Sequence, residues 1–125
     1  MKSTKREDLA RAWIHLQNAP RESKSHRENF WAHEAIWELL HNNPDEAWST
    51  ILEILKQDKS DWIIENLAAG PLEDLLVAHG RQFIGHIEAV ADDPIFQKLA
   101  RLVWKNDIPD DVWLRLQAIR NSNAE

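Results

Sequence analysis

The sequence predicts an all-α fold, a compact irregular stack of about seven short helices in antiparallel hairpins, within a single domain spanning residues 1–125. Apolar residues recur at spacings of three and four along most of the chain, and no segment alternates with a period of two. Short helices joined by tight Pro and Gly corners favour hairpins over a bundle of long helices. Four of the five prolines stand at expected helix starts, where proline is tolerated, namely Pro44, Pro71, Pro94 and Pro109.

Capping signals open each of the first three expected helices. Thr4-Lys5-Arg6-Glu7 is a capping box, in which the hydroxyl and the carboxylate each accept from a first-turn N–H group. A loop around Pro20 follows, and Ser25-His26-Arg27-Glu28 is expected to open a long second helix. Asn43-Pro44 begins the third. The expected apolar faces are Leu9, Ala12, Trp13 and Leu16, then Phe30, His33, Trp37, Leu40 and His41, then Ala47, Trp48, Ile51, Leu52 and Leu55.

The central stretch predicts a helix, a corner and a second helix. Ser60 can cap the first of these helices, and Gly70 is expected to end it in the left-handed conformation that C-terminal caps favour. Pro71 then opens the next helix, which leaves through His79-Gly80. The amide of Asn66 is expected to tie down the Gly70 backbone. Asn66, Gly70 and Pro71 are therefore the predicted structural corner.

The last three expected helices are indicated by residues at their starts and by the spacing of their apolar residues. One runs from Arg81 to Ala91, a second begins at Asp93-Pro94, and a third begins at Pro109-Asp110. Their expected apolar faces are Phe83, Ile84, Ile87 and Val90, then Ile95, Phe96, Leu99, Leu102 and Val103, then Val112, Trp113, Leu116 and Ile119.

The central residues also carry a resemblance. The run from Glu65 to Leu76, ENLAAGPLEDLL, followed by His79-Gly80, resembles a bacterial family of small helical proteins catalogued only as a domain of unknown function. The resemblance extends from Ala12 to Leu114 and implies an all-helical fold without a known activity. Gly85-His86 departs from the family pattern, so a role for His86 would be particular to this chain.

Composition excludes several classes of function. There is no cysteine, which excludes disulfides, thiolate metal sites and cysteine nucleophiles. Fifteen basic and 21 acidic residues give a net charge of −6, which disfavours a nucleic-acid partner and suits a basic protein partner. The N-terminal segment lacks the apolar core of a signal peptide, and no apolar run reaches membrane-spanning length. We therefore expect a cytoplasmic protein without a membrane partner.

The histidines and carboxylates do not complete a catalytic or metal motif. His33-Glu34 begins like the zinc motif HExxH, but Trp37 stands where the second histidine belongs. Glu38 and His41 have the Glu-x-x-His spacing of carboxylate-bridged metal sites, which need a second copy that this sequence lacks. No phosphate-binding glycine loop or nucleophile elbow is present. We expect no catalytic residue, metal or cofactor.

Seven tryptophans are many for 125 residues. Five are in phase with apolar faces and are expected in the core, namely Trp13, Trp37, Trp48, Trp104 and Trp113. Trp31 and Trp62 fit those faces less well, and an exposed tryptophan among acids resembles an interface anchor. The predicted partner-binding surface is Asp58, Asp61, Trp62 and Glu65.

These observations favour a non-enzymatic protein that acts through protein–protein contact, as an immunity-type antagonist or an adaptor for a basic partner. The alternative is a small enzyme or ligand-binding domain that uses one helix face, formed by His33, Glu34, Glu38 and His41. A concave pocket with convergent polar side chains favours the alternative, and an exposed aromatic on an acidic surface favours the first hypothesis.

Overall fold

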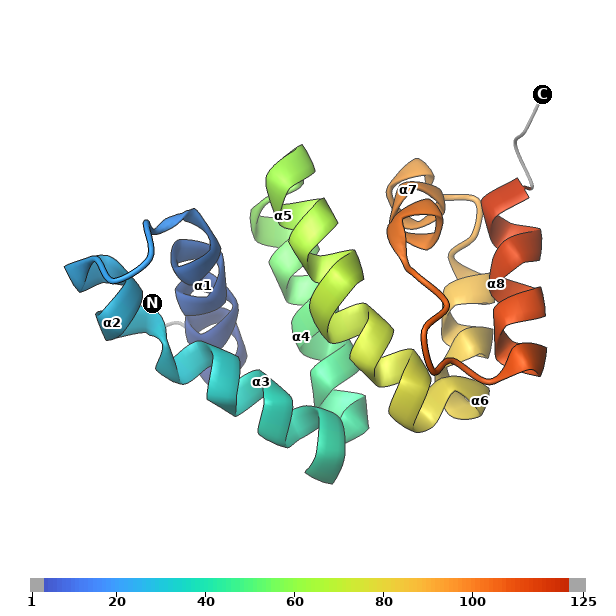
Figure 1. The fold of residues 1–125 in the computed structure, drawn as a ribbon, viewed down its shortest axis with the longest axis horizontal. Coiled ribbons are helices and arrows are strands. Elements are labelled where there is room, and N and C mark those ends of the chain that lie inside the picture. Colours follow the sequence, from blue (N-terminus) through green and yellow to red (C-terminus); the bar gives the residue numbers. More distant parts are fainter. Residues whose placement is uncertain (1–3, 122–125) are drawn as a thin grey trace. The chain divides into compact units, whose positions relative to one another are not determined.

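The computed structural model describes residues 4–121, and the described chain is helical without a strand, which confirms the predicted all-α class (Figure 1). The helices in chain order are α1 (Lys5–Asn18), α2 (Lys24–Asn29), α3 (Trp31–Asn42), α4 (Pro44–Gln57), α5 (Asp61–Leu67), the π-helical turn η1 (Ala68–Leu72), α6 (Glu73–Ala89), α7 (Pro94–Leu102) and α8 (Asp110–Asn121).

The chain divides into two compact units, Met1–Ile63 and Ile64–Glu125. In the first unit α1 packs against α2, α3 and α4, and α3 packs against α4. In the second unit η1 and α8 pack against α6, and α7 packs against α8 and η1. That the whole chain forms one domain stays a prediction. The largest fully buried side chains are Leu40, Ile51, Ile54 and Ile63 in the first unit and Ile64, Leu67, Leu72, Leu75, Leu76, Phe83, Ile84 and Ile87 in the second.

Local capping determines where most helices begin, as the sequence predicts. The Thr4 hydroxyl accepts from the N–H of Glu7, and the Glu7 carboxylate accepts from the N–H of Thr4, so the first capping box is confirmed. Asn43 caps α4, Ser60 accepts from an N–H in the first turn of α5, and Asp93 caps α7.

The second predicted capping box is wrong. Ser23, not Ser25, caps α2, and its hydroxyl accepts from the N–H of His26. The N–H of Ser23 bonds to the carbonyl of Pro20, and this turn leaves Ser23 in the extended conformation that an N-cap residue needs. The predicted long helix is divided at Phe30, where the N–H of His33 bonds to the Phe30 carbonyl.

The predicted left-handed corner at Gly70 and the helix start at Pro71 are also wrong, whereas the role of Asn66 in holding the Gly70 backbone stays a prediction. Among the described glycines none has a positive φ, and α5, η1 and the part of α6 before His79 continue one another as a helix, from green to yellow in Figure 1. A π-helical turn has i→i+5 hydrogen bonds in place of i→i+4, which accommodates a proline without an N–H inside a helix. Asn66 lies half-buried in α5, before this turn.

The predicted exit at His79-Gly80 is confirmed as a kink, at which one helical segment of α6 ends and a second begins. α6 continues to Ala89, and His79 has the non-helical angles φ −139° and ψ 33°. Gly80 lies where α6 packs closely on α8, because a Cβ atom there would stand 3.0 Å from Cγ1 of Val112. A close approach of helices, rather than a turn, requires this glycine.

The division of the tryptophans into buried and exposed side chains differs from the prediction. Trp13 and Trp48 are buried as predicted, and Trp113 is half-buried. Trp37 and Trp104 were expected in the core but are 56% and 72% exposed. α3 packs through a narrower stripe than expected, namely Ala32, Ile36 and Leu40, which leaves Phe30 and His33 exposed too.

Candidate functional site

The first unit has a groove of about 760 Å³ between the start of α1, the C-terminal half of α3 and the start of α4. Leu9, Ala35 and Leu39 give it an apolar lining, and Arg6 and Glu46 stand at its polar side. Apolar walls with a few polar groups are the usual composition of ligand pockets.

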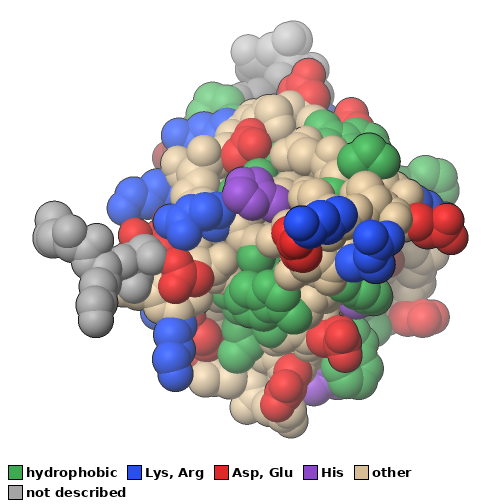
Figure 2. All heavy atoms as spheres, turned by 90° about the vertical axis from the view of Figure 1, so that its left-hand side faces the viewer, with side chains coloured by type: hydrophobic (Ala, Val, Ile, Leu, Met, Phe, Trp, Pro, Cys, Tyr) green, Lys and Arg blue, Asp and Glu red, His purple; other side chains and the backbone are tan. Residues whose placement is uncertain are grey.

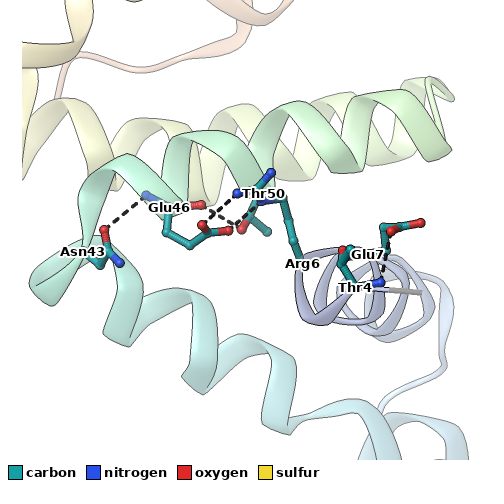
Figure 3. A network of polar contacts seen from close by, with 6 residues as sticks. All are labelled: Thr4, Arg6, Glu7, Asn43, Glu46 and Thr50. Carbon is teal, nitrogen blue, oxygen red and sulfur yellow. Dashed lines mark hydrogen bonds and ion pairs between the residues drawn. The ribbon is translucent and has the colours of Figure 1, made fainter. Parts of the chain in front are cut away.

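The polar side of this groove is occupied by its own ion pair. Arg6 Nε donates to Glu46 Oε2 at 2.6 Å, and Nη2 donates to Oε1 at 2.9 Å (Figure 3). The Glu46 backbone is held as well, since its N–H donates to Asn43 and its carbonyl accepts from the Thr50 hydroxyl. The hydrogen bond and charge of Arg6 lower the pKa of the Glu46 carboxyl. We interpret the pair as a clamp between α1 and α4. Two of the three guanidinium nitrogens of Arg6, Nε and Nη2, already donate to the Glu46 carboxylate.

We expect Glu46→Gln to lower the melting temperature near neutral pH and to have little effect in strong acid. A carboxyl whose pKa is lowered in the folded state stabilises above its ordinary pKa, and this stabilisation disappears as the pH falls through the lowered value. Thermal melts at about pH 7 and about pH 2 measure the difference. Arg6→Gln provides the control, because Glu46→Gln should add little once the partner is gone. An equal effect of Glu46→Gln at both pH values would contradict the clamp.

The outer face of α3 forms a second hollow, of about 450 Å³. Its lining consists of His33, Glu34, Trp37, Glu38 and Asn42. Three of the four residues of the alternative site, all except His41, therefore lie together. The His41 ring instead packs against the Trp37 ring, tilted by 35° with centroids 4.0 Å apart, and its Nδ1 lies 2.8 Å from the Trp37 carbonyl oxygen.

Figure 2 looks onto the first unit from the left of Figure 1 and shows hydrophobic side chains gathered among acidic, basic and histidine side chains. The large apolar residues exposed on this unit are Phe30, Trp31, Trp37, Leu52 and Trp62. Neither Glu34 nor Glu38 forms an ion pair or a side-chain hydrogen bond within residues 4–121. In the same described part, no three His, Asp or Glu side chains lie close enough to hold a metal ion.

The predicted partner-binding surface lies at the start of α5. Trp62 is 53% exposed, and its Nε1–H donates to the carbonyl of Gln17 at 2.8 Å. Asp58 accepts from the N–H of Ser60, which fixes the turn before the helix. Asp61 and Glu65 are exposed on the helix itself. Within the first unit the predicted surface thus combines a hydrogen-bonded, exposed indole with exposed Asp61 and half-buried Asp58, and Glu65 belongs to the second unit.

Ion pairs in the second unit join helices instead of forming a site. Arg81 binds Asp111 through two hydrogen bonds of 2.9 and 3.1 Å, and Arg115 binds Glu88, so α6 is linked to α8 twice. Each arginine lowers the pKa of its partner carboxyl by hydrogen bonding and charge. All four side chains are partly exposed, and their pairing accounts for these pKa shifts without a catalytic role.

No helix within residues 4–121 combines the length and the apolar character needed to cross a lipid bilayer.

A family model described as a family of unknown function (DUF6869) matches residues 19–124. No curated protein and no solved structure matches the chain.

Proposed function

The chain belongs to this family of unknown function (DUF6869), and we propose that it is a non-enzymatic protein of the bacterial cytoplasm that acts by contact with a basic protein, as an antagonist or adaptor. One observation carries the proposal. Trp62 exposes half of its surface while its indole N–H is bonded inside the first unit. Tryptophan is enriched among the residues that dominate binding energy at protein interfaces.

The hydrogen bond to Gln17 is what distinguishes Trp62 as an anchor. An exposed side chain loses rotamer freedom when a partner covers it, and this loss weakens binding. The bond to the Gln17 carbonyl already restricts the indole, so less freedom is left to lose on contact. The ring is therefore preorganised for a partner surface.

Charge supports a basic partner. The chain has a net charge of −6, and Asp61 directly precedes Trp62 in sequence, with Asp58 four residues before it. Acids around an aromatic anchor attract a basic protein and raise the association rate. The ring that the partner covers on binding mainly lowers the dissociation rate. An antagonist that masks a basic surface needs both properties.

A ligand-binding domain is the second candidate, and one observation favours it. His33, Glu34 and Glu38 line a common hollow, as the alternative hypothesis requires. His41 is turned onto Trp37 and does not line that hollow. The hollow therefore lacks one of the four residues that the alternative hypothesis assigns to this helix face.

We expect Trp62→Ala to weaken binding of the native partner by about 2 kcal/mol, close to thirty-fold. Immobilised protein would be used to capture partners from a lysate of the native host, followed by binding kinetics with the partner so identified. Trp104→Ala is the matched control, since Trp104 is even more exposed but lies in the second unit. Trp62→Phe keeps an aromatic ring without the hydrogen bond and should weaken binding less.

The charge reversals Asp58→Lys and Asp61→Lys should mainly lower the association rate, as should added salt. Thermal melts of every variant separate lost contact from lost folding. An acidic partner, or kinetics indifferent to salt and to Trp62→Ala, would refute this surface.

A further inference from the structure

The hollow on α3 places an aromatic ring beside two carboxylates. Trp37 belongs to its lining, together with Glu34 one turn earlier and Glu38 next in sequence. His41, one turn later, packs against the Trp37 ring and is not part of the lining. The indole thus contacts the His41 ring and also contributes to the lining of the hollow. A ring held in this way keeps its orientation when a ligand stacks on it.

The two carboxylates of the hollow are not held in ion pairs, although Glu38 also contributes to the lining of the first groove, as do Lys5 and Arg6. Within residues 4–121 neither Glu34 nor Glu38 has an ion-pair partner, whereas Glu46, Glu88 and Asp111 each bind an arginine. No lysine or arginine lines the hollow. Glu34 and Glu38 are four residues apart on one helix, where like charges repel and destabilise the helix. A cation placed between them would relieve this repulsion.

We propose that this hollow binds the guanidinium group of an arginine side chain presented by the protein partner. A guanidinium is planar, so it can stack on the indole of Trp37 while its N–H groups donate to the carboxylates of Glu34 and Glu38. An ammonium group is compact and more strongly hydrated, so it gains less from the ring. The inference rests on the proposed protein–protein function and assigns an arginine to the basic partner.

Blocked tetra-arginine, tetra-lysine and tetra-citrulline peptides test this site without the native partner. Citrulline has the shape of arginine but no charge. The indole N–H resonance of Trp37, assigned by its absence in Trp37→Leu, would be followed in heteronuclear NMR titrations. We expect a saturable shift of this resonance with tetra-arginine, a smaller response with tetra-lysine and none with tetra-citrulline.

Variants then locate the site. Glu34→Gln and Glu38→Gln should each weaken tetra-arginine binding about two- to five-fold, and Trp37→Leu should do so by a similar factor. Trp31→Leu is the matched control, because Trp31 is 48% exposed on the same helix but does not line the hollow. All four positions are exposed, so folding should be retained, which melting curves verify.

The proposal is overturned if tetra-citrulline binds as well as tetra-arginine, if the Trp37 resonance stays unchanged, or if the glutamine variants bind with unchanged affinity. Its failure is distinguishable from failure of the proposed function. The peptide titration reports on α3 alone, whereas capture of the native partner with Trp62→Ala reports on the start of α5.

Discussion

Replacing Trp13 with alanine is expected to lower the free energy of unfolding by about 3–5 kcal/mol. Trp13 is only 3% exposed and lies in α1, which packs against three other helices of the first unit. Removal of the indole forfeits its burial and leaves a cavity that the surrounding helices fill only partly. The same substitution at Trp104, which is mostly exposed, should change the free energy by less than about 0.5 kcal/mol.

Urea unfolding followed by circular dichroism measures both variants against the wild type. The comparison holds the chemistry constant and varies only burial. A large loss at Trp104 would mean that this residue is in the core, as its spacing in the sequence predicts, and would contradict the structure described above. A small loss at Trp13 would place the hydrophobic core of the first unit elsewhere.

Replacing Gly80 with valine is expected to destabilise the chain by about 1–3 kcal/mol. Even the Cβ atom of an alanine would lie 3.0 Å from Cγ1 and 3.1 Å from Cγ2 of Val112, so the added methyl groups of valine would push α6 away from α8. Gly70 and Gly85 have open space where a Cβ would stand, and neither has a positive φ. Gly70→Ala and Gly85→Ala should therefore stabilise the chain by about 0.4–1 kcal/mol each, because alanine restricts the unfolded chain.

A double-mutant cycle identifies the cause of the Gly80 effect. Val112→Ala removes the two methyl groups that the new side chain would meet, so Gly80→Ala should cost less in that background than in the wild type. Equal costs in both backgrounds would show that Val112 is not the obstacle. Destabilisation by Gly70→Ala would instead restore the left-handed corner that the sequence predicts.

Helix starts were predictable because a cap is a local contact. The bonds made by Thr4, Asn43 and Asp93 each reach no more than three residues along the chain. The Arg6–Glu46 clamp joins residues forty positions apart, and no spacing rule finds such a pair. The first groove, which depends on three helices converging, could not be predicted for the same reason.

The exposure of Trp37 in α3 could not be predicted for a different reason. Helical spacing shows which residues share a face, but it does not show how wide the buried stripe is. Trp37 is one residue from Ile36, and the helix turns Ile36 inward along with Ala32 and Leu40. Small and branched side chains let α3 approach its neighbours, so the bulkier aromatic remains outside. The predicted surface around Trp62 did lie at the start of a helix, because one short segment contains most of it.

The π-helical turn η1 has a geometric consequence for every residue that follows it. Buried residues in this part of the chain come in adjacent pairs repeated every four positions, namely Ile63 and Ile64, Leu67 and Ala68, Pro71 and Leu72, and Leu75 and Leu76. In a regular α-helix such a repeat drifts around the axis by about 40° per step, or about 120° over three steps.

A π-helical turn has about 4.4 residues per turn, so its five residues recover about 90° of that drift. η1 thus keeps a four-residue repeat on one side of a helix that turns every 3.6 residues. If the five residues of η1 were regular α-helix instead, the start of α6 would be rotated by about 90° relative to α5. Leu75 and Leu76 would then face away from the interior, so the wider π-helical turn keeps the two helices in register.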